Sequence, residues 1–172
     1  MKNNNLKLII DSYKDFPQKG IVFRDVLPIL RNPDIFSNLI DEMSSSEVLK
    51  NSDAIIAIDA RGFIFGSAIS FHISKPLVVA RKPGKLPGEI KSKSYSLEYG
   101  SNSLSIQEKS LSEYQTFFII DDLLATGGTV NCVADIINSK GKQVTGLSVV
   151  VEIKDLNAKS KFNFPVESQV IY

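Results

Sequence analysis

The segment that most constrains the fold of this chain covers residues 116–129 and reads TFFIIDDLLATGGT. Its first five residues are rich in aromatic and β-branched side chains, a composition that predicts a buried strand. Two carboxylates, Asp121 and Asp122, stand where we expect that strand to end. A short loop then leads into TGGT at 126–129, which opens a helical pattern that runs to about Ser139. Strand, glycine loop and helix in this order predict an α/β fold with its ligands at the carboxyl ends of the strands.

The glycine loop has the features of an anion site. The free N–H groups in the first turn of a helix point outward, and the helix dipole favours negative charge there. Gly127 and Gly128 allow the backbone to come close to a phosphate, and Thr126 and Thr129 add hydroxyl donors. The two acids would repel a bare phosphate, so they need a different task. We expect them to accept hydrogen bonds from the hydroxyls of a sugar. Phosphate and diol together describe a ribose 5-phosphate, and the alternative is an ordinary strand-to-helix turn with solvated acids.

The overall composition sets the limits within which this motif acts. A length of 172 residues suits one α/β domain. An apolar content of 43%, a charged content of 23% and a formal net charge of +1 give no general reason to expect nucleic-acid or membrane binding. The single cysteine, Cys132, excludes an internal disulfide framework and a cysteine metal cluster. The N-terminus is polar, and no apolar run approaches the ~20 residues that span a bilayer, so we expect a cytoplasmic protein.

A second unit of strand, turn and helix lies earlier in the chain. AIIAI at 54–58 predicts a buried strand, DARG at 59–62 a tight turn, and residues 63–73 a helix. Backbone amides together with the guanidinium of Arg61 suit a diphosphate. On spacing alone, an anion site and a plain turn explain this segment equally well.

A third apolar strand at 76–80 leads into the basic loop RKPGKLPG at 81–88. Its cations, Arg81, Lys82 and Lys85, indicate either a solvated loop or a lid that brings positive charge to a polyanion. Beyond it, apolar and polar residues alternate on both sides of GSNS at 100–103, a pattern that predicts a β-hairpin.

The two ends of the chain carry weaker signals. Apolar residues at helical spacing over 4–13 predict an amphipathic helix, and Asn32-Pro33 predicts the capped start of another. IVFRD at 21–25 is uninformative taken alone. Near the C-terminus, residues 144–151 predict a strand, 152–161 a turn or short helix, and 170–172 a last strand.

Residues 116–129 resemble the phosphoribosyl diphosphate signature of the type I phosphoribosyltransferases, and three further motifs resemble the adenine-specific branch of that family. These motifs are DFPQKGIVFRD at 15–25, RKPGKLPG at 81–88 and YSLEYG at 95–100. The resemblance covers roughly residues 14–152. It implies a mainly parallel central sheet flanked by helices, within a single domain over 1–172. It also implies an N-terminal hood over about 1–32 and a flexible hairpin lid over about 82–107.

The activity that this resemblance implies is a step of purine salvage, the transfer of the 5-phosphoribosyl group from phosphoribosyl diphosphate to adenine. The products would be AMP and diphosphate. The family's use of Mg²⁺ implies a metal that is held by substrate oxygens and water and has no direct protein ligand. Asp121 and Asp122 are the residues that would hold the metal-bound water. Because the family's loop arginine, here Arg81, reaches the diphosphate bound by a neighbouring subunit, the resemblance also implies a homodimer. No nucleic-acid or membrane partner is expected.

The resemblance assigns a role to each motif. It implies that the ribose 5-phosphate is bound by Asp121, Asp122, Ala125, Thr126, Gly127, Gly128 and Thr129. It implies that the diphosphate is bound by Asp59, Ala60, Arg61, Gly62, Arg81, Lys82 and Lys85. Adenine would be held by Val22, Phe23, Arg24 and Leu123, with Phe23 and Leu123 on its two faces. Glu98 and Tyr99 would manage the proton at the purine, and Arg81 would assist catalysis.

Other functions fit the sequence less well. Gly141 and Gly146 have the spacing of a P-loop, but Leu147 stands where that motif needs lysine. A regulator that senses phosphoribosyl diphosphate and a 6-oxopurine-specific relative remain the two rivals. The chain departs from many relatives at Ala158-Lys159, where they carry Gly-Arg. We expect this change to affect packing or dimer contacts and to leave the substrate site untouched.

Overall fold

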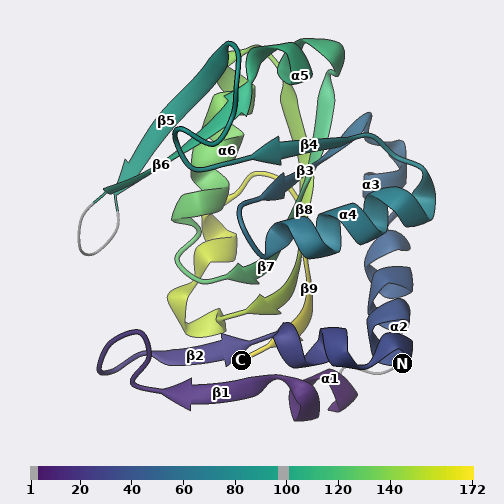
Figure 1. Ribbon diagram of the computed structural model, residues 1–172, viewed down its shortest axis with the longest axis vertical. Helices are drawn as coiled ribbons and strands as arrows, with labels where there is room; N and C mark the ends of the chain where they lie inside the picture. Colours follow the sequence, from purple (N-terminus) through teal and green to yellow (C-terminus); the bar gives the residue numbers. More distant parts are fainter. Residues whose placement is uncertain (1–3, 97–100) are drawn as a thin grey trace.

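A five-stranded parallel sheet forms the centre of the protein in a computed structural model that describes residues 4–96 and 101–172 (Figure 1). Its strand order is β4-β3-β7-β8-β9, and every neighbouring pair is parallel. The strands are β3 (Ala54–Ile58), β4 (Leu77–Ala80), β7 (Thr116–Leu124), β8 (Gln143–Glu152) and β9 (Val166–Ile171). The α/β fold with a mainly parallel sheet is therefore confirmed.

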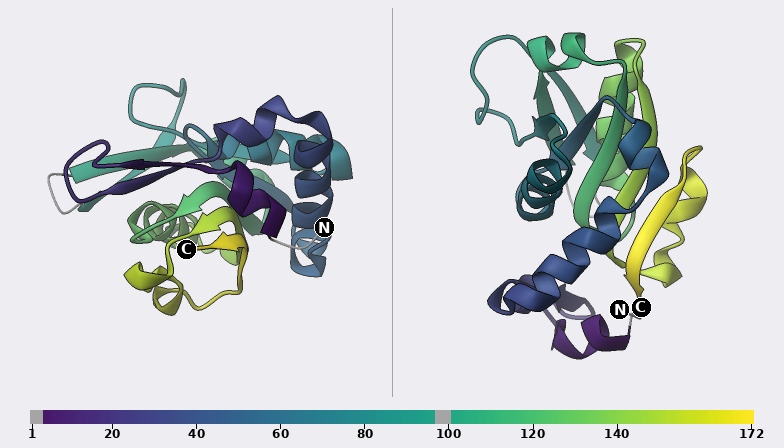
Figure 2. Two further views of the ribbon diagram at one scale, coloured as in Figure 1. Left: turned by 90° about the horizontal axis from the view of Figure 1, so that it is seen from below. Right: turned by 90° about the vertical axis from the view of Figure 1, so that its right-hand side faces the viewer.

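Helices cover both faces of the sheet, which explains why its strands are continuous apolar runs. All five residues of β3 are buried. Its Ile56 joins an apolar cluster with α6 (Gly128–Ser139), whereas Ile55 joins the cluster of α2 (Pro33–Ser44) and α4 (Gly62–Ile73) on the other face. Figure 2 shows α6 and the pair α2 and α4 on opposite sides of the strands.

The helix starts follow the local sequence. The side chain of Asn32 accepts a hydrogen bond from the N–H of Ile35 at 3.2 Å, and Pro33 takes the first position of α2, as predicted. Two short helices, α3 (Glu47–Asn51) and α5 (Glu108–Glu113), were not predicted from the sequence. No described helix is both long and apolar enough to cross a membrane.

The N-terminal segment differs from its prediction. Helix α1 (Asn4–Ile9) ends early, and β1 (Asp11–Lys14) pairs antiparallel with β2 (Val22–Asp25). The predicted helix over 4–13 is therefore wrong beyond Ile9. The spacing of Tyr13 fits a helix, but its backbone pairs with Phe23 in this hairpin, a partner that no local pattern reveals. The 3₁₀ helix η1 (Leu27–Arg31) then leads into α2.

The hairpin that the sequence predicted is confirmed, but residues 101–103, which were expected to form its turn, lie in its second strand. Strands β5 (Ile90–Ser96) and β6 (Ser101–Gln107) pair antiparallel. Seen from below in Figure 2, both two-stranded sheets extend to the same side of the molecule. After β8, the 3₁₀ helices η2 (Lys154–Leu156) and η3 (Ala158–Lys161) confirm the expected turn or short helix. The expected last strand is present as β9, which begins four residues before the predicted start and ends at Ile171.

Candidate active site

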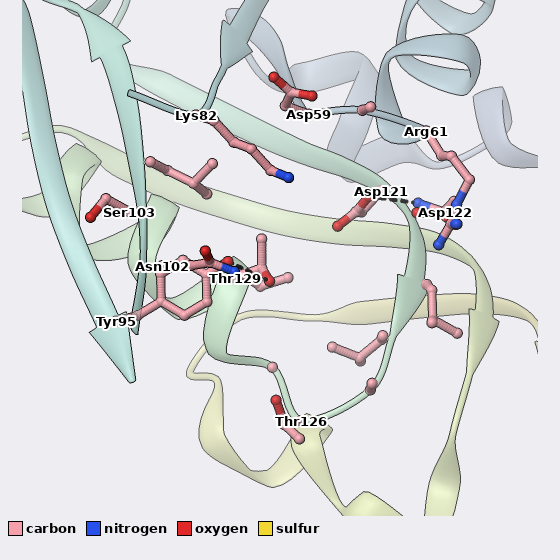
Figure 3. A pocket seen from close by; sticks show the side chains of 17 residues that line it. Asp59, Arg61, Lys82, Tyr95, Asn102, Ser103, Asp121, Asp122, Thr126 and Thr129 are labelled. Atoms are coloured by element: carbon pink, nitrogen blue, oxygen red, sulfur yellow. Dashed lines mark hydrogen bonds and ion pairs between the residues drawn. The ribbon is translucent and has the colours of Figure 1, made fainter. Parts of the chain in front are cut away.

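A cavity of about 360 Å³ lies at the carboxyl ends of β3 and β7 (Figure 3). One wall is the turn at 59–61, and another is the end of β7 with the loop that leads into α6. The hairpin closes a third side through Tyr95 and residues 102–104. The two segments that the sequence identified as anion sites thus face one cavity, as expected for parallel strands whose carboxyl ends share an edge.

Glycines allow these two segments to approach closely. A Cβ placed on Gly62 would lie 2.8 Å from Oδ1 of Asp121 and 3.1 Å from the carbonyl oxygen of Ile120. The turn after β3 therefore packs directly on the end of β7, where only glycine fits. At the start of α6, Gly127 has φ +82°, a left-handed conformation that strongly favours glycine.

The paired acids lie within β7, which continues to Leu124, so the prediction that the strand ends before them is wrong. Both acids are buried. A carboxylate oxygen of Asp121 accepts a hydrogen bond from the N–H of Asp122 at 2.8 Å. Burial raises the pKa of Asp121 well above its ordinary value, and the neighbouring charge of Asp122 raises it further.

Arg61 connects the two walls. Its Nε donates to Oδ2 of Asp122 at 2.5 Å, and its guanidinium lies 5.1 Å from the centre of the Phe23 ring. The one guanidinium thus contacts both a sugar-site acid and the aromatic ring predicted to stack on the base. The neighbouring peptide bond between Asp59 and Ala60 is cis.

The three predicted loop cations lie at different places. Lys82 lines the cavity, whereas Arg81 and Lys85 lie outside its described lining. Nε of Arg81 pairs with Oδ2 of Asp59 at 3.2 Å, and one of its terminal nitrogens donates to the carbonyl of Lys85 at 3.3 Å. Asp59 itself lines the cavity, so Arg81 sits directly behind the cavity wall.

A second cavity, of about 460 Å³, adjoins the first and shares Leu123 and Ala125 with it. The sequence-predicted base residues Val22, Phe23, Arg24 and Leu123 all line this second cavity. Its other lining residues are Gly20, Ile21, Ala125, Ile153, Asp155, Leu156 and Tyr172. An apolar compartment suited to a flat ring thus lies next to the anion-binding compartment.

Tyr172 is a part of this second cavity that the sequence did not reveal. The guanidinium of Arg24 lies 3.9 Å from the centre of its ring, and the ammonium of Lys7 lies 5.2 Å from the same ring. A terminal nitrogen of Arg24 also donates to Oγ of Ser12 at 2.5 Å. The sequence predicted only that Tyr172 ends a strand, and no local motif marks it as a wall of a site.

The hairpin rests on the loop and on α6. Thr129 Oγ1 donates to the Tyr95 hydroxyl at 3.4 Å, and the Tyr95 ring lies 3.3 Å from where a Cβ on Gly128 would stand. Farther along, the ammonium of Lys93 pairs with Asp135 at 2.7 Å. Two predicted catalytic residues, Glu98 and Tyr99, lie outside the described residues.

The segment after β8 lies beside the glycine loop. A Cβ on Gly127 would lie 3.2 Å from Cβ of Ala158 and 3.0 Å from the ring of Phe162. The ammonium of Lys161 donates to the carbonyl oxygen of Thr126 at 2.8 Å. Ala158 therefore packs beside the glycine loop, in line with the expected effect on packing, and the independence of the substrate site from the change at Ala158-Lys159 stays a prediction.

The carboxylates suit a magnesium ion that arrives with its substrate. Among the described residues, no group of three or more histidine, cysteine, aspartate or glutamate side chains is arranged to hold a metal alone. Asp59, Asp121 and Asp122 line the cavity and offer only oxygen donors. Mg²⁺ keeps several waters and is usually bound through one or two carboxylates plus substrate phosphates, a requirement that these residues meet.

A family model described as a phosphoribosyl transferase domain matches residues 28–164. The chain therefore belongs to the phosphoribosyl transferase family. Its curated relatives include the adenine phosphoribosyltransferases of Prochlorococcus marinus strains MIT 9211 and MIT 9515. The first is 59% identical over 100% of both chains, and the second is 60% identical over 98% of this chain and 99% of the relative. Within the family, the chain thus belongs to the adenine phosphoribosyltransferases.

Solved structures agree with this assignment. The adenine phosphoribosyltransferase of Thermoanaerobacter pseudethanolicus has a TM-score of 0.92 and 36% identity, and covers 99% of this chain and 100% of its own. The enzyme of Saccharomyces cerevisiae, complexed with an imino-altritol bisphosphate and adenine, has a TM-score of 0.88 and 34% identity over 97% of both chains.

Proposed function

We propose that this chain transfers the 5-phosphoribosyl group of phosphoribosyl diphosphate to adenine, releasing diphosphate and forming AMP in purine salvage. The observation that carries the proposal is the pair of adjoining cavities that share Leu123 and Ala125. One has the acids and the glycine loop, and the other has Phe23. The yeast relative was crystallised with an imino-altritol bisphosphate and adenine, a phosphate-bearing ligand together with the base.

The walls of the first cavity suggest how the sugar phosphate is held. The loop over 125–129 would receive the 5-phosphate through backbone N–H groups, and Thr126 and Thr129 would add hydroxyls. Asp121 and Asp122 would accept hydrogen bonds from the ribose diol. Because Asp122 pairs with Arg61 at 2.5 Å, the same contact would hold the sugar acids and the turn after β3 in a fixed relation.

The diphosphate would occupy the space beside the turn at 59–62, where the Arg61 guanidinium and Lys82 supply positive charge. Lys85 would add charge when the loop closes, and the Arg81 of the neighbouring subunit would reach this diphosphate. Mg²⁺, held by substrate oxygens and by water that Asp121 and Asp122 would hold in place, would add positive charge at the leaving diphosphate.

The chemistry follows from this arrangement of charge. Departure of the diphosphate leaves positive charge on the ribose ring, and adenine held between Phe23 and Leu123 would attack the anomeric carbon from the adjoining cavity. Cations that stabilise the leaving group lower the barrier most, since negative charge develops there. Glu98, assisted by Tyr99, would exchange the purine proton. No covalent nucleophile is required.

We further propose that the chain acts as a cytoplasmic homodimer with a single domain over residues 1–172. Residues 1–32 would form the hood over the base, since Val22, Phe23 and Arg24 line the second cavity. Residues 82–107 would form the lid, since Lys82, Tyr95 and residues 102–104 line the first.

The test is diphosphate release from phosphoribosyl diphosphate and Mg²⁺ with adenine, hypoxanthine, guanine or orotate added singly. We expect turnover with adenine alone. Turnover with an oxopurine instead would keep the sugar phosphate site and overturn the base specificity. Tight binding of phosphoribosyl diphosphate without turnover of any base would indicate the regulator and overturn the enzyme.

A further inference from the structure

The segment from Ala158 to Phe162 lies beside the glycine loop, and none of its residues belongs to the described lining of the cavity. Ala158 and Lys161 bound the short helix η3, and Phe162 follows it directly. Ala158 is buried at 2% exposure and belongs to the apolar cluster beneath α6, and the Phe162 ring packs against the same cluster. The Phe162 ring also stacks on Phe164 with their centres 5.1 Å apart. The segment next to the loop is therefore anchored by its packing on the apolar core.

The segment reaches the loop at its most constrained residue. Gly127 has φ +82°, and a side chain there would lie within 3.2 Å of both Ala158 and Phe162. Glycine is thus required for its backbone conformation and for lack of space. The atom of Ala158 that limits this space is its Cβ, so this residue lies directly beside Gly127.

Lys161 adds a charged hydrogen bond to this packing. Its ammonium donates to the carbonyl oxygen of Thr126 at 2.8 Å. That carbonyl and the N–H of Gly127 belong to one peptide group. A cation on the oxygen polarises the peptide, so its N–H becomes a stronger donor to an anion. The ammonium also adds positive charge next to a loop that is built to receive a phosphate.

We propose that Lys161 is a positioning residue for the 5-phosphate of the substrate, acting through the peptide between Thr126 and Gly127. The inference rests on the proposed function, because it assigns the glycine loop to a phosphomonoester. Ala158 and Phe162 pack beside the loop, and the ammonium orients and polarises the peptide whose N–H belongs to Gly127, the residue that precedes α6 and lines the cavity. The base cavity is untouched by this contact.

The experiment compares Lys161→Gln with a matched control, Lys159→Gln. Both lysines are exposed residues of η3, and both changes remove one positive charge, but the Lys161 ammonium alone bonds to Thr126 among the described contacts. We measure the Kd for ribose 5-phosphate by calorimetry without adenine or Mg²⁺. We also measure KM for phosphoribosyl diphosphate, KM for adenine, and Tm.

For Lys161→Gln we expect Kd and KM for the sugar phosphates to rise about 5- to 10-fold, the effect of one charged hydrogen bond. The KM for adenine and the Tm should stay unchanged. Lys161→Arg should restore sugar phosphate binding, and Lys159→Gln should behave as the wild type. Equal effects of the two glutamine variants, or an equal rise in the adenine KM, would overturn the proposal.

The two proposals fail in different ways. If the wild type binds ribose 5-phosphate without turning over any base, the enzyme assignment fails, while the comparison of Kd values still decides the role of Lys161. If the wild type binds no ribose 5-phosphate, both proposals fail.

Discussion

Among single residues, Asp121 is one whose burial in the site lowers the stability of the folded protein at neutral pH. Its buried carboxyl accepts one hydrogen bond, from the N–H of Asp122, and lies next to the charge of that residue. Because its pKa is raised in the folded state, the folded protein holds a proton that the unfolded chain has released. Its contribution therefore makes the protein less stable as pH rises above the unfolded pKa of about 4.

We predict that Asp121→Asn raises the thermal stability at pH 7 and lowers activity. The amide is uncharged at every pH and keeps an oxygen for the N–H of Asp122. Folding then no longer requires a buried carboxyl to take up a proton, so the Tm should rise by roughly 2–4 °C, the shift that 1 kcal/mol gives in a domain of this size. The gain should shrink as pH falls towards the unfolded pKa of about 4 and vanish below it, where the carboxyl is neutral in both states. Thermal unfolding at a series of pH values measures this directly.

Asp53→Asn is the control variant, for which we expect the opposite change in stability at pH 7. Hydrogen bonds from the backbone N–H groups of Thr116 and Gln115 lower the pKa of Asp53, so its stabilising effect is present at neutral pH and lost as pH falls through its folded pKa. This variant should be less stable than the wild type at pH 7. If Asp121→Asn also lost stability at pH 7, or if its gain did not depend on pH, the cost assigned to the buried carboxyl would be wrong.

At the scale of elements, helix α4 is held against β3 by a close contact at Gly66. A Cβ on this residue would lie 2.5 Å from Cβ of Ala57 in the strand. The same helix begins at Gly62, directly after the turn that carries Arg61. Its distance from the sheet therefore sets the position of that turn in the cavity.

We predict that Gly66→Ala destabilises the protein by about 1–3 kcal/mol, the cost of overpacking a close contact. The sign of the stability change separates two effects. Helix propensity alone would make the alanine variant more stable by about 1 kcal/mol, whereas the close contact with Ala57 makes it less stable. Denaturant unfolding measures the change. Ser67→Ala, at an exposed position of the same helix, should leave stability unchanged or slightly raise it. A Gly66→Ala variant as stable as the wild type would mean that α4 can move without cost.

The elements differ in how well the sequence predicts them, for physical reasons. Strands β3, β4 and β7 were predicted because parallel strands covered on both faces must be continuous apolar runs. Strand β1 was missed because its formation depends on pairing with β2, eight residues beyond its end, and not on its own pattern. The helices α3 and α5 are too short, at five and six residues, to show a helical period.

The same distinction applies to the site as a whole. Asp121, Asp122 and the glycine loop are adjacent in sequence, so one motif predicts them together. Tyr172 and Lys161 reach the site from the C-terminal part of the chain, through the parallel order β7-β8-β9. Nothing in their own neighbourhood indicates which loop or cavity they contact, so only the three-dimensional structure reveals them.

At the scale of the whole molecule, Arg81 decides how the proposed dimer works. Within one chain it pairs with Asp59 behind the cavity wall, and its side chain is 35% exposed. If this arginine reaches the diphosphate of a neighbouring subunit, each active site needs residues from two chains. A site with its own acids intact could then use the Arg81 of its partner.

We predict that two inactive variants restore each other when they are co-expressed. One subunit carries Arg81→Ala, the other carries Asp121→Asn with Asp122→Asn, and two affinity tags isolate the mixed dimer. One of its two sites combines intact acids with an intact Arg81, so about half of the wild-type activity should return per dimer. Each variant alone supplies the inactive control. A mixed dimer without activity would mean that Arg81 serves the site of its own chain, and a monomer in light scattering would remove the shared site altogether.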